Sequence, residues 1–488
     1  MTNQVEVIAE ERRHKLFLAA VLLTNIMTML NTTTVTISLP SYMAIFGVDI
    51  NAVQWVSVGY LLPLGMVMPL SEYLCERYSY RRVFLLSVAA MGICSLCCAC
   101  SVTFFMLVFF RFLKGIAGGL VIPCTMAMLY RYIPKQLQAN YLGNAVLFQS
   151  IGVAIGPTLA GILLQISSWH MLFLVNLPLV LIVLWAGQKS IPAETGNQAD
   201  SFDFVGILQV SVGTGMVMVA FTEGDAWGWT SPLFLACFGV GLALVLLFIF
   251  RQTHTTHPLL NFAVLKYRPF VLALLIQCTL AMTLGITAIL AQIYFQTVRG
   301  YSPAAVGIFL LFPSLMMLIG NKAANGLHKK GVSRWLIMIG MGIAALGNMG
   351  LCGLSLDTGI VYLLLCFCLR YLGMGILQMP LTDYGLSSVP PHLSGHASSM
   401  YNWGKQLTQV VSTNVLTVLL SLNLTRYYLA AGNTGTPVEG TAAYNIAATQ
   451  AVNSDFFYLS VFLVISFLCT FMIRPQNKKM GREKCTVS

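Results

Sequence analysis

Fourteen runs of mostly apolar residues, each about 20 residues long, follow one another along the chain and are separated by short polar segments. A helix of about 20 apolar residues crosses the hydrocarbon core of a bilayer. Lipid offers no hydrogen-bond partners to the backbone, and these runs are too long and too evenly apolar for barrel strands. The pattern therefore predicts an all-α polytopic membrane protein. The predicted spans are 16–39, 53–73, 83–102, 104–129, 141–165, 170–188, 204–222, 231–250, 269–293, 304–324, 334–355, 359–385, 396–421 and 456–473.

The composition supports this interpretation. Of the 488 residues, 57% are hydrophobic and only 9% are charged, whereas soluble domains carry roughly 25% charged residues. A soluble chain of this size could not cover its surface with so few charges, while helices that face lipid do not need them. The composition excludes an ordinary soluble enzyme and a disordered or fibrous protein.

The net charge of +11 follows from topology. If the N-terminus lies in the cytoplasm, the inner segments hold 21 of the 27 Lys and Arg residues, and the outer segments hold only Arg299 and Arg426. This asymmetry is the positive-inside pattern. It predicts a multi-pass protein of the plasma (inner) membrane with both termini in the cytoplasm, and it removes the reason to expect a nucleic-acid partner.

Two short patterns recur along the chain in the same order. Leu74-x-x-Arg77-x-x-x-Arg81 returns 253 residues later as Leu327-x-x-Lys330-x-x-x-Arg334, and Arg111-Phe112-Leu113 returns 259 residues later as Arg370-Tyr371-Leu372. Parallel repeats of this kind are typical of transporters whose halves move against each other. The predicted organisation is a cytoplasmic N-terminus (1–15), a six-helix bundle (16–190), an inserted helix pair with its linker (191–252), a second six-helix bundle (253–473) and a cytoplasmic tail (474–488).

Motifs for catalysis or ATP hydrolysis are missing from the sequence. It has no GxxxxGK[ST] loop, no HExxH motif and no cluster of His, Asp and Glu on one helical face. We therefore expect neither an enzyme nor a bound cofactor or metal. Transport, if it is the activity, would be driven by an ion gradient.

Six segments between residues 30 and 178 match a set of transporter motifs. They are Leu30 to Pro40, Gln54-Trp55 with Tyr60, Pro69 to Arg82, Arg111-x-x-Lys114-Gly115-x-x-Gly118-Gly119, Gly152-x-x-x-Gly156-Pro157-x-x-Ala160-Gly161, and Trp169 to Pro178 with Asn176. Together they resemble the fourteen-helix drug/proton antiporters of the major facilitator superfamily, which include quaternary-ammonium and multidrug exporters.

The resemblance implies a fold of two six-helix bundles plus two inserted helices, and export of amphipathic small molecules in exchange for protons. We expect a monomer in the lipid bilayer, and a periplasmic adaptor is left open. By the same resemblance the cytoplasmic gate would comprise Glu76, Arg77, Arg81 and Arg82. The antiporter motif would form a hinge or seal against the opposite half through Gly152, Gly156, Pro157 and Gly161.

Four positions depart from the family pattern. Asn31 replaces the aspartate of the first helix, and Lys114 replaces a glutamine. Glu72 and Ser79 replace two glycines of the segment after the second helix. Because asparagine does not titrate, proton coupling through the family's usual residue is not expected.

Charged residues inside spans are costly and therefore suggest function. Five are predicted in or at the edge of the spans, and no carboxylate is predicted at mid-depth; the five are Arg111, Lys114, Arg370, Asp383 and Lys405. We predict that Asn31, Arg111, Lys114 and Arg370 line one wet, cationic central cavity. Asp383 and Lys405 would form an ion pair near the cytoplasmic ends of their spans.

Three functions remain open from the sequence. The first is an exporter of amphipathic drugs coupled to protons. The second is an exporter of an endogenous anionic metabolite or lipid without the usual proton coupling, suggested by Asn31 and Lys114. The third is a membrane sensor or receptor that does not transport, although it leaves the two-fold repeat unexplained.

Overall fold

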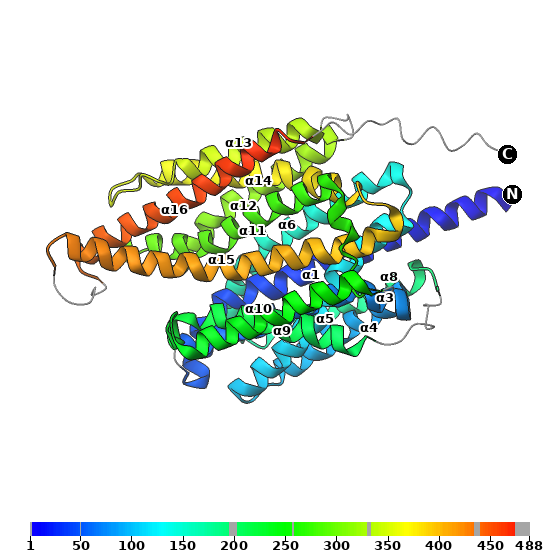
Figure 1. Cartoon of the computed structure of the whole chain (residues 1–488), viewed down its shortest axis with the longest axis horizontal. Coiled ribbons are helices and arrows are strands. Elements are labelled where there is room, and N and C mark those ends of the chain that lie inside the picture. Colours follow the sequence, from blue (N-terminus) through cyan, green and yellow to red (C-terminus); the bar gives the residue numbers. More distant parts are fainter. Residues whose placement is uncertain are drawn as a thin grey trace.

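The computed structural model describes residues 2–48, 50–194, 203–255, 258–328, 333–433 and 440–473. All the secondary-structure elements assigned in this part of the chain are helices (Figure 1). Thirteen helical stretches are long and apolar enough to cross a membrane. The remaining predicted span is α13 (Ser333–Met349), which is 17 residues long. All fourteen apolar runs are therefore helical, and the chain is a multi-pass membrane protein.

The first bundle is built from six long helices and three short ones. The long helices are α1 (Thr2–Phe46), α2 (Ile50–Val67), α4 (Tyr80–Ala99), α5 (Phe104–Tyr132), α6 (Lys135–Ile166) and α8 (Asn176–Ser190), and the short ones are η1 (Met68–Leu70), α3 (Ser71–Tyr78) and α7 (Met171–Leu174). Thr103 caps α5 by accepting a hydrogen bond from the Met106 amide. Ser79 separates α3 from α4 with a φ of 86°, a left-handed conformation that favours the glycine of the family pattern.

The second bundle repeats this arrangement. It contains α11 (Arg268–Gln292), the π-helix η3 (Ile293–Val298), α12 (Pro303–His328), α13, α14 (Ile360–Leu386), η4 (Pro391–Leu393), α15 (Ser394–Ala430) and α16 (Ala442–Thr470), and η2 (Phe262–Lys266) precedes it. We call the side on which α1 begins and α16 ends the terminal side, which the charges predict to be cytoplasmic. In Figure 1 the start of α1 and the end of α16 both lie toward this end.

The last connection between spans is shorter than the sequence predicted. The apolar pattern ends α15 at position 421 and starts the next helix at 456, but α15 continues to Ala430 and α16 begins at Ala442. Thr441 caps α16 by accepting a hydrogen bond from the Tyr444 amide. The polar residues of this region, which include Asp455 near the middle of α16, interrupt the apolar pattern on which the prediction depended.

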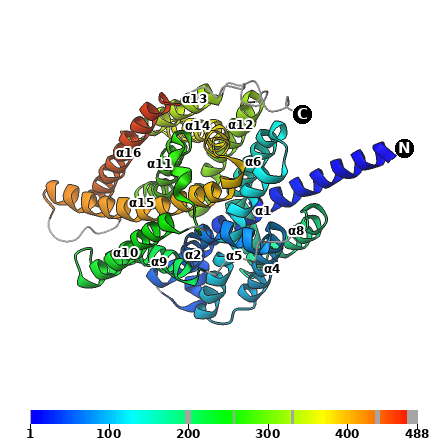
Figure 2. The same ribbon diagram turned by 45° about the vertical axis from the view of Figure 1, so that its right-hand side comes forward.

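The inserted pair consists of α9 (Phe204–Trp227) and α10 (Pro232–His254). A salt bridge of 2.8 Å between Arg251 and Asp203 joins the end of α10 to the start of α9. α9 packs against α2 of the first bundle and α15 of the second, whereas α10 packs mainly on α9 (Figure 2). Only 17% of the apolar stretch of α10 is buried within the protein. The pair therefore lies beside the two bundles, with α9 along the seam between them.

Candidate functional site

The two bundles are joined by polar contacts at mid-depth and on the terminal side. Ser398 donates to the carbonyl of Pro123 at 3.0 Å, and the Asn321 amide donates to the Ser150 hydroxyl at 2.7 Å. Tyr130 donates to the Asp383 carboxylate at 3.3 Å. The described hydrogen bonds between the bundles thus gather at mid-depth and on the terminal side. This conformation is closed on the terminal side.

The short helix α3 places two acidic side chains at this seam. Glu72 is buried and accepts a short hydrogen bond from the Tyr80 hydroxyl. Its carboxylate occupies the space that a Cβ atom on Gly395, in the first turn of α15, would need. Glu76 is half-exposed, and its carboxylate lies 3.8 Å from the His396 imidazole of α15. Both acids therefore contact the start of a helix from the other bundle, where the helix dipole is positive.

The basic residues of the predicted gate have other roles in this state. Arg81 donates to the carbonyl of Gln188, at the end of α8, at 2.7 Å. The Arg82 amide donates to the Ser79 hydroxyl at 3.4 Å and so helps to begin α4. The Arg77 guanidinium lies 5.9 Å from the ring centroid of Tyr78. The contact of Glu76 across the seam thus comes from His396, which the sequence did not single out.

Arg111 and Arg370 occupy equivalent places in the two bundles. Arg111 donates to the backbone carbonyls of Val56, at 2.8 Å, and of Asn31 in α1, at 3.1 Å. Arg370 donates to the carbonyl of Thr283, in α11, at 2.7 Å. Each arginine thus ties the fourth long helix of its bundle to the first, as expected if the bundles are structural repeats.

Lys114 lies one helical turn after Arg111 in α5 of the first bundle. Its ammonium group has no hydrogen-bond partner among the described residues and faces the Phe173 ring of α7, 5.4 Å from the centroid. The structure therefore brings Asn31 and Arg111 together but keeps Arg370 in the other bundle. No more than 2% of the surface of any of the four residues is exposed. The wet cavity shared by Asn31, Arg111, Lys114 and Arg370 is not formed in this conformation, because helix packing shields all four side chains.

Asp383 and Lys405 do not form the predicted ion pair in the part of the chain that the structure describes. Asp383 instead binds the His328 imidazole at 3.0 Å, besides accepting the hydrogen bond from Tyr130. His328 ends α12 and Tyr130 lies near the end of α5, so the carboxylate faces these helices. The prediction considered only charges on adjacent spans, and a histidine at a helix end was not weighed as the partner.

The glycines of the antiporter motif contact their own bundle. A Cβ on Gly152 would lie 2.6 Å from the Met29 Cβ of α1, and one on Gly156 would collide with Thr33. No atom lies within 4 Å of the corresponding position at Gly161, and the Pro157 side chain lies outside the described residues. α6 instead meets the other bundle through Ser150 and through Gly143, which packs against Asn325. The expected contact of Gly152 and Gly156 with the opposite half is therefore wrong for this conformation, because α1 covers them.

Asp455 is the charged residue that the sequence interpretation missed. It lies near the middle of α16, is completely buried, and neither carboxylate oxygen has a hydrogen-bond partner among the described residues. Because the last span was predicted to begin at position 456, Asp455 was assigned to an outer loop. The capping threonine, Thr441, is the signal that could have extended the helix to include it.

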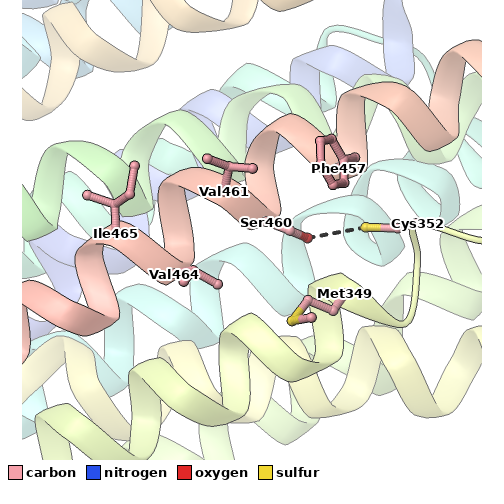
Figure 3. Close-up of a pocket in the computed structure, with 7 residues that line it drawn as sticks. All are labelled: Met349, Cys352, Phe457, Ser460, Val461, Val464 and Ile465. Atoms are coloured by element: carbon pink, nitrogen blue, oxygen red, sulfur yellow. Dashed lines mark hydrogen bonds between the residues drawn. The ribbon is translucent and has the colours of Figure 1, made fainter.

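A groove of about 310 Å³ lies between α13 and α16 (Figure 3). Its lining is apolar except for Ser460, whose hydroxyl is 3.2 Å from the Cys352 sulfur. Both helices belong to the second bundle, so the groove is not part of the seam between the halves. It is therefore separate from the candidate gate.

Comparisons with known proteins agree with this architecture. Residues 21–413 match the family described as Major Facilitator Superfamily. The chain is 25% identical to lincomycin resistance protein LmrB of Listeria monocytogenes, over 94% of this chain and 96% of the relative. It is 27% identical to the tetracenomycin C resistance and export protein of Streptomyces glaucescens, over 83% of this chain and 75% of the relative. The crystal structure of the human organic anion transporter MFSD10 has a similar fold, with a TM-score of 0.65 and 13% identity over 94% of this chain and 99% of that one.

Proposed function

The chain belongs to the major facilitator superfamily, and on that premise we propose that it exports amphipathic small molecules, drugs among them, in exchange for protons. The family and the relatives make it a membrane transporter. The proposal adds the substrate class, the direction and the coupling ion. It also places the protein in the plasma membrane, as a monomer, with the terminal side facing the cytoplasm. Two relatives named for resistance to lincomycin and for tetracenomycin C resistance and export support the drug-export part.

The observation that carries the mechanism is the one-sided closure between the bundles. The contacts Ser398–Pro123, Asn321–Ser150 and Tyr130–Asp383 lie at mid-depth or on the terminal side. If the bundles rock against each other, these contacts break when the terminal side opens, and substrate can enter from that side. The buried acid Glu72 and the half-exposed acid Glu76 would hold this gate shut against the start of α15.

A second candidate is the export of anionic or zwitterionic molecules. The observation that favours it is the unpaired positive charge inside the bundles: the Lys114 ammonium and two nitrogens of Arg370 have no hydrogen-bond partner among the described residues. Buried cations without partners are costly, and an anion or water that enters when the bundles move would relieve this cost. Arg111 already binds two carbonyls, so it contributes less to this argument.

Dye uptake by inside-out membrane vesicles tests the proposal. Vesicles from cells that make the protein should take up a cationic dye when respiration acidifies their lumen, and a protonophore should abolish the uptake. Vesicles without the protein provide the background. Uptake of an anionic dye but not of a cationic one would select the second candidate. Uptake of neither, by protein shown to be folded, would contradict both.

A further inference from the structure

Asp455 is a carboxylate in a helix long and apolar enough to span the membrane, and it has no hydrogen-bond partner among the described residues. The side chain is fully buried in α16, and both of its oxygens lack a hydrogen bond in the described structure. An ionised carboxylate in such a place is strongly disfavoured unless something neutralises it. The site therefore requires a positively charged ligand or a proton.

The surroundings exclude a fixed cation of the protein as that partner. α16 packs against α11, η3, α13 and α15. Their titratable groups near this level form bonds elsewhere: Tyr294 of η3 donates to the Ser355 carbonyl, and Tyr427 of α15 bonds to the Ser454 hydroxyl. Just beyond α13, Cys352 contacts Ser460. The other titratable groups of these elements are Cys278 of α11 and His396, Tyr401 and Tyr428 of α15. The charged groups are Arg268 of α11, Arg299 at the end of η3, Arg334 of α13, and Lys405 and Arg426 of α15. No described charge interacts appreciably with Asp455.

A metal ion is a poor alternative. The described residues contain no group of three or more His, Cys, Asp and Glu side chains that could hold one. Calcium takes six to eight oxygen ligands and magnesium takes six. A single carboxylate among apolar side chains supplies too few of them, whereas a proton needs only one oxygen.

The register of α16 against α11 places Asp455 next to a structural irregularity. Ser466 donates to Thr279 of α11 at 2.8 Å, and the two helices run in opposite directions. Eleven residues back along α16, Asp455 therefore lies at the level of Leu290. The α-helix gives way to the π-helix η3 three residues later, at Ile293. Packing of Val298 with Tyr444 and Ala448 at the far end of η3 agrees with this register.

This position gives the carboxylate an element that can respond to it. π-helical segments within longer helices are uncommon and often occur at functional sites, because each can revert to α-helix by shifting one residue. Such a shift in η3 would move a segment that packs against α16 about one helical turn from Asp455. Proton binding and the conformation of the outer half of α11 would then be linked.

We propose that Asp455 is a proton-binding site of this transporter and supplies the titratable group that Asn31 does not. The inference rests on the proposed proton-coupled transport, which it deepens by naming the residue. In the protonated state the carboxylic acid is neutral and is compatible with its apolar enclosure. Rearrangement of η3 admits water, and the proton leaves.

Infrared difference spectroscopy of the whole protein in lipid tests the proton site without measuring transport. A pH step should reveal the carbonyl stretch of a protonated carboxylic acid in the parent. Asp455→Asn should lose this band, and Asp455→Glu should shift it. The control is Glu223→Gln in the inserted helix α9, which should keep the band of the parent. A band that persists unchanged in Asp455→Asn, in protein that elutes as one symmetrical peak, would overturn the assignment.

Transport under an imposed pH gradient tests the coupling. If one proton is exchanged for each dye molecule, accumulation by the parent should change about tenfold per unit of gradient. Asp455→Asn should show almost no response, whereas Asp455→Glu and Glu223→Gln should respond like the parent. A parental response in Asp455→Asn would overturn the coupling role. If the parent accumulates no dye in any gradient, the proposed function fails, and the infrared band still decides whether Asp455 binds a proton.

Discussion

Arg370 donates a hydrogen bond of 2.7 Å to the backbone carbonyl of Thr283, and this contact ties α14 to α11. In the first bundle, Arg111 makes the same kind of contact with Asn31 and ties α5 to α1. The two arginines are 259 residues apart and the two carbonyls 252, close to the 253-residue offset of the loop motif. The buried arginines are thus positioned as structural counterparts in a repeated bundle.

This equivalence predicts that the two arginines respond alike to substitution. Lysine keeps the charge but lacks the planar fork of arginine, so Arg111→Lys and Arg370→Lys should each leave a buried carbonyl without its donor. The expected loss is about 1–3 kcal/mol, seen as a lower midpoint of thermal unfolding in detergent. Arg131→Lys, in an exposed pair with Glu194, is the control and should change the midpoint little. Unchanged midpoints in both buried variants would argue against the structural role.

The close contact between Glu72 and Gly395 predicts a coupled pair. Gly395→Ala should push the carboxylate away and open the terminal side, because the added Cβ needs the space that Glu72 occupies. Glu72→Ala in the same chain should remove this clash, so the double variant should open no further than Glu72→Ala alone. The reporter is maleimide labelling of Ala397→Cys, a position buried in this state, in a chain without its 13 native cysteines. Additive effects of the two substitutions would show that the contact does not hold the gate.

Glu76→Gln should also favour the terminal-side-open state, but to a smaller extent. The carboxylate is half-exposed and 3.8 Å from His396, and exposed pairs contribute about 0–1 kcal/mol. The expected increase in labelling at Ala397→Cys is therefore up to about fivefold. His396→Gln should give a similar increase in labelling, and the double variant should be labelled no more than either single variant. Labelling at the level of the parent, with normal expression, would favour a purely topological role for this segment.

Lys114→Gln distinguishes the two substrate classes. It restores the residue of the family pattern and removes an ammonium group that has no hydrogen-bond partner among the described residues. If that charge serves anionic substrates, the variant should transport anionic dyes several-fold less well and with a flatter pH dependence, because lysine can titrate in a dry site and glutamine cannot. Cationic dyes transported equally by both proteins, with anionic dyes ignored by both, would assign Lys114 to packing against Phe173.

The sequence was sufficient to predict the fold because each apolar run predicts one membrane-spanning helix, and the number of runs gives the number of spans. It also located the segment around Glu76 and the paired arginines, since these carry recognisable motifs. Partners on distant helices were harder to predict. His328 and His396 are isolated histidines at helix ends, and only the three-dimensional packing brings them to Asp383 and Glu76.

Two errors have different physical causes. Asp455 was placed in a loop because polar residues interrupt the apolar pattern before position 456, whereas α16 begins at Ala442. The antiporter glycines were assigned to the interface between the halves because a sequence does not show in which direction a helix face points. In this conformation Gly152 and Gly156 face α1.

Transport by the purified protein in liposomes tests the proposed export of amphipathic molecules in exchange for protons. The protein would be reconstituted, a cationic and an anionic dye supplied outside, and an acidic lumen imposed by dilution, with protein-free liposomes as the background. We expect concentrative uptake of dye that requires the pH gradient and is accompanied by alkalinisation of the lumen. Dye movement that only equilibrates, at the same rate with and without the gradient and without proton flux, would contradict it.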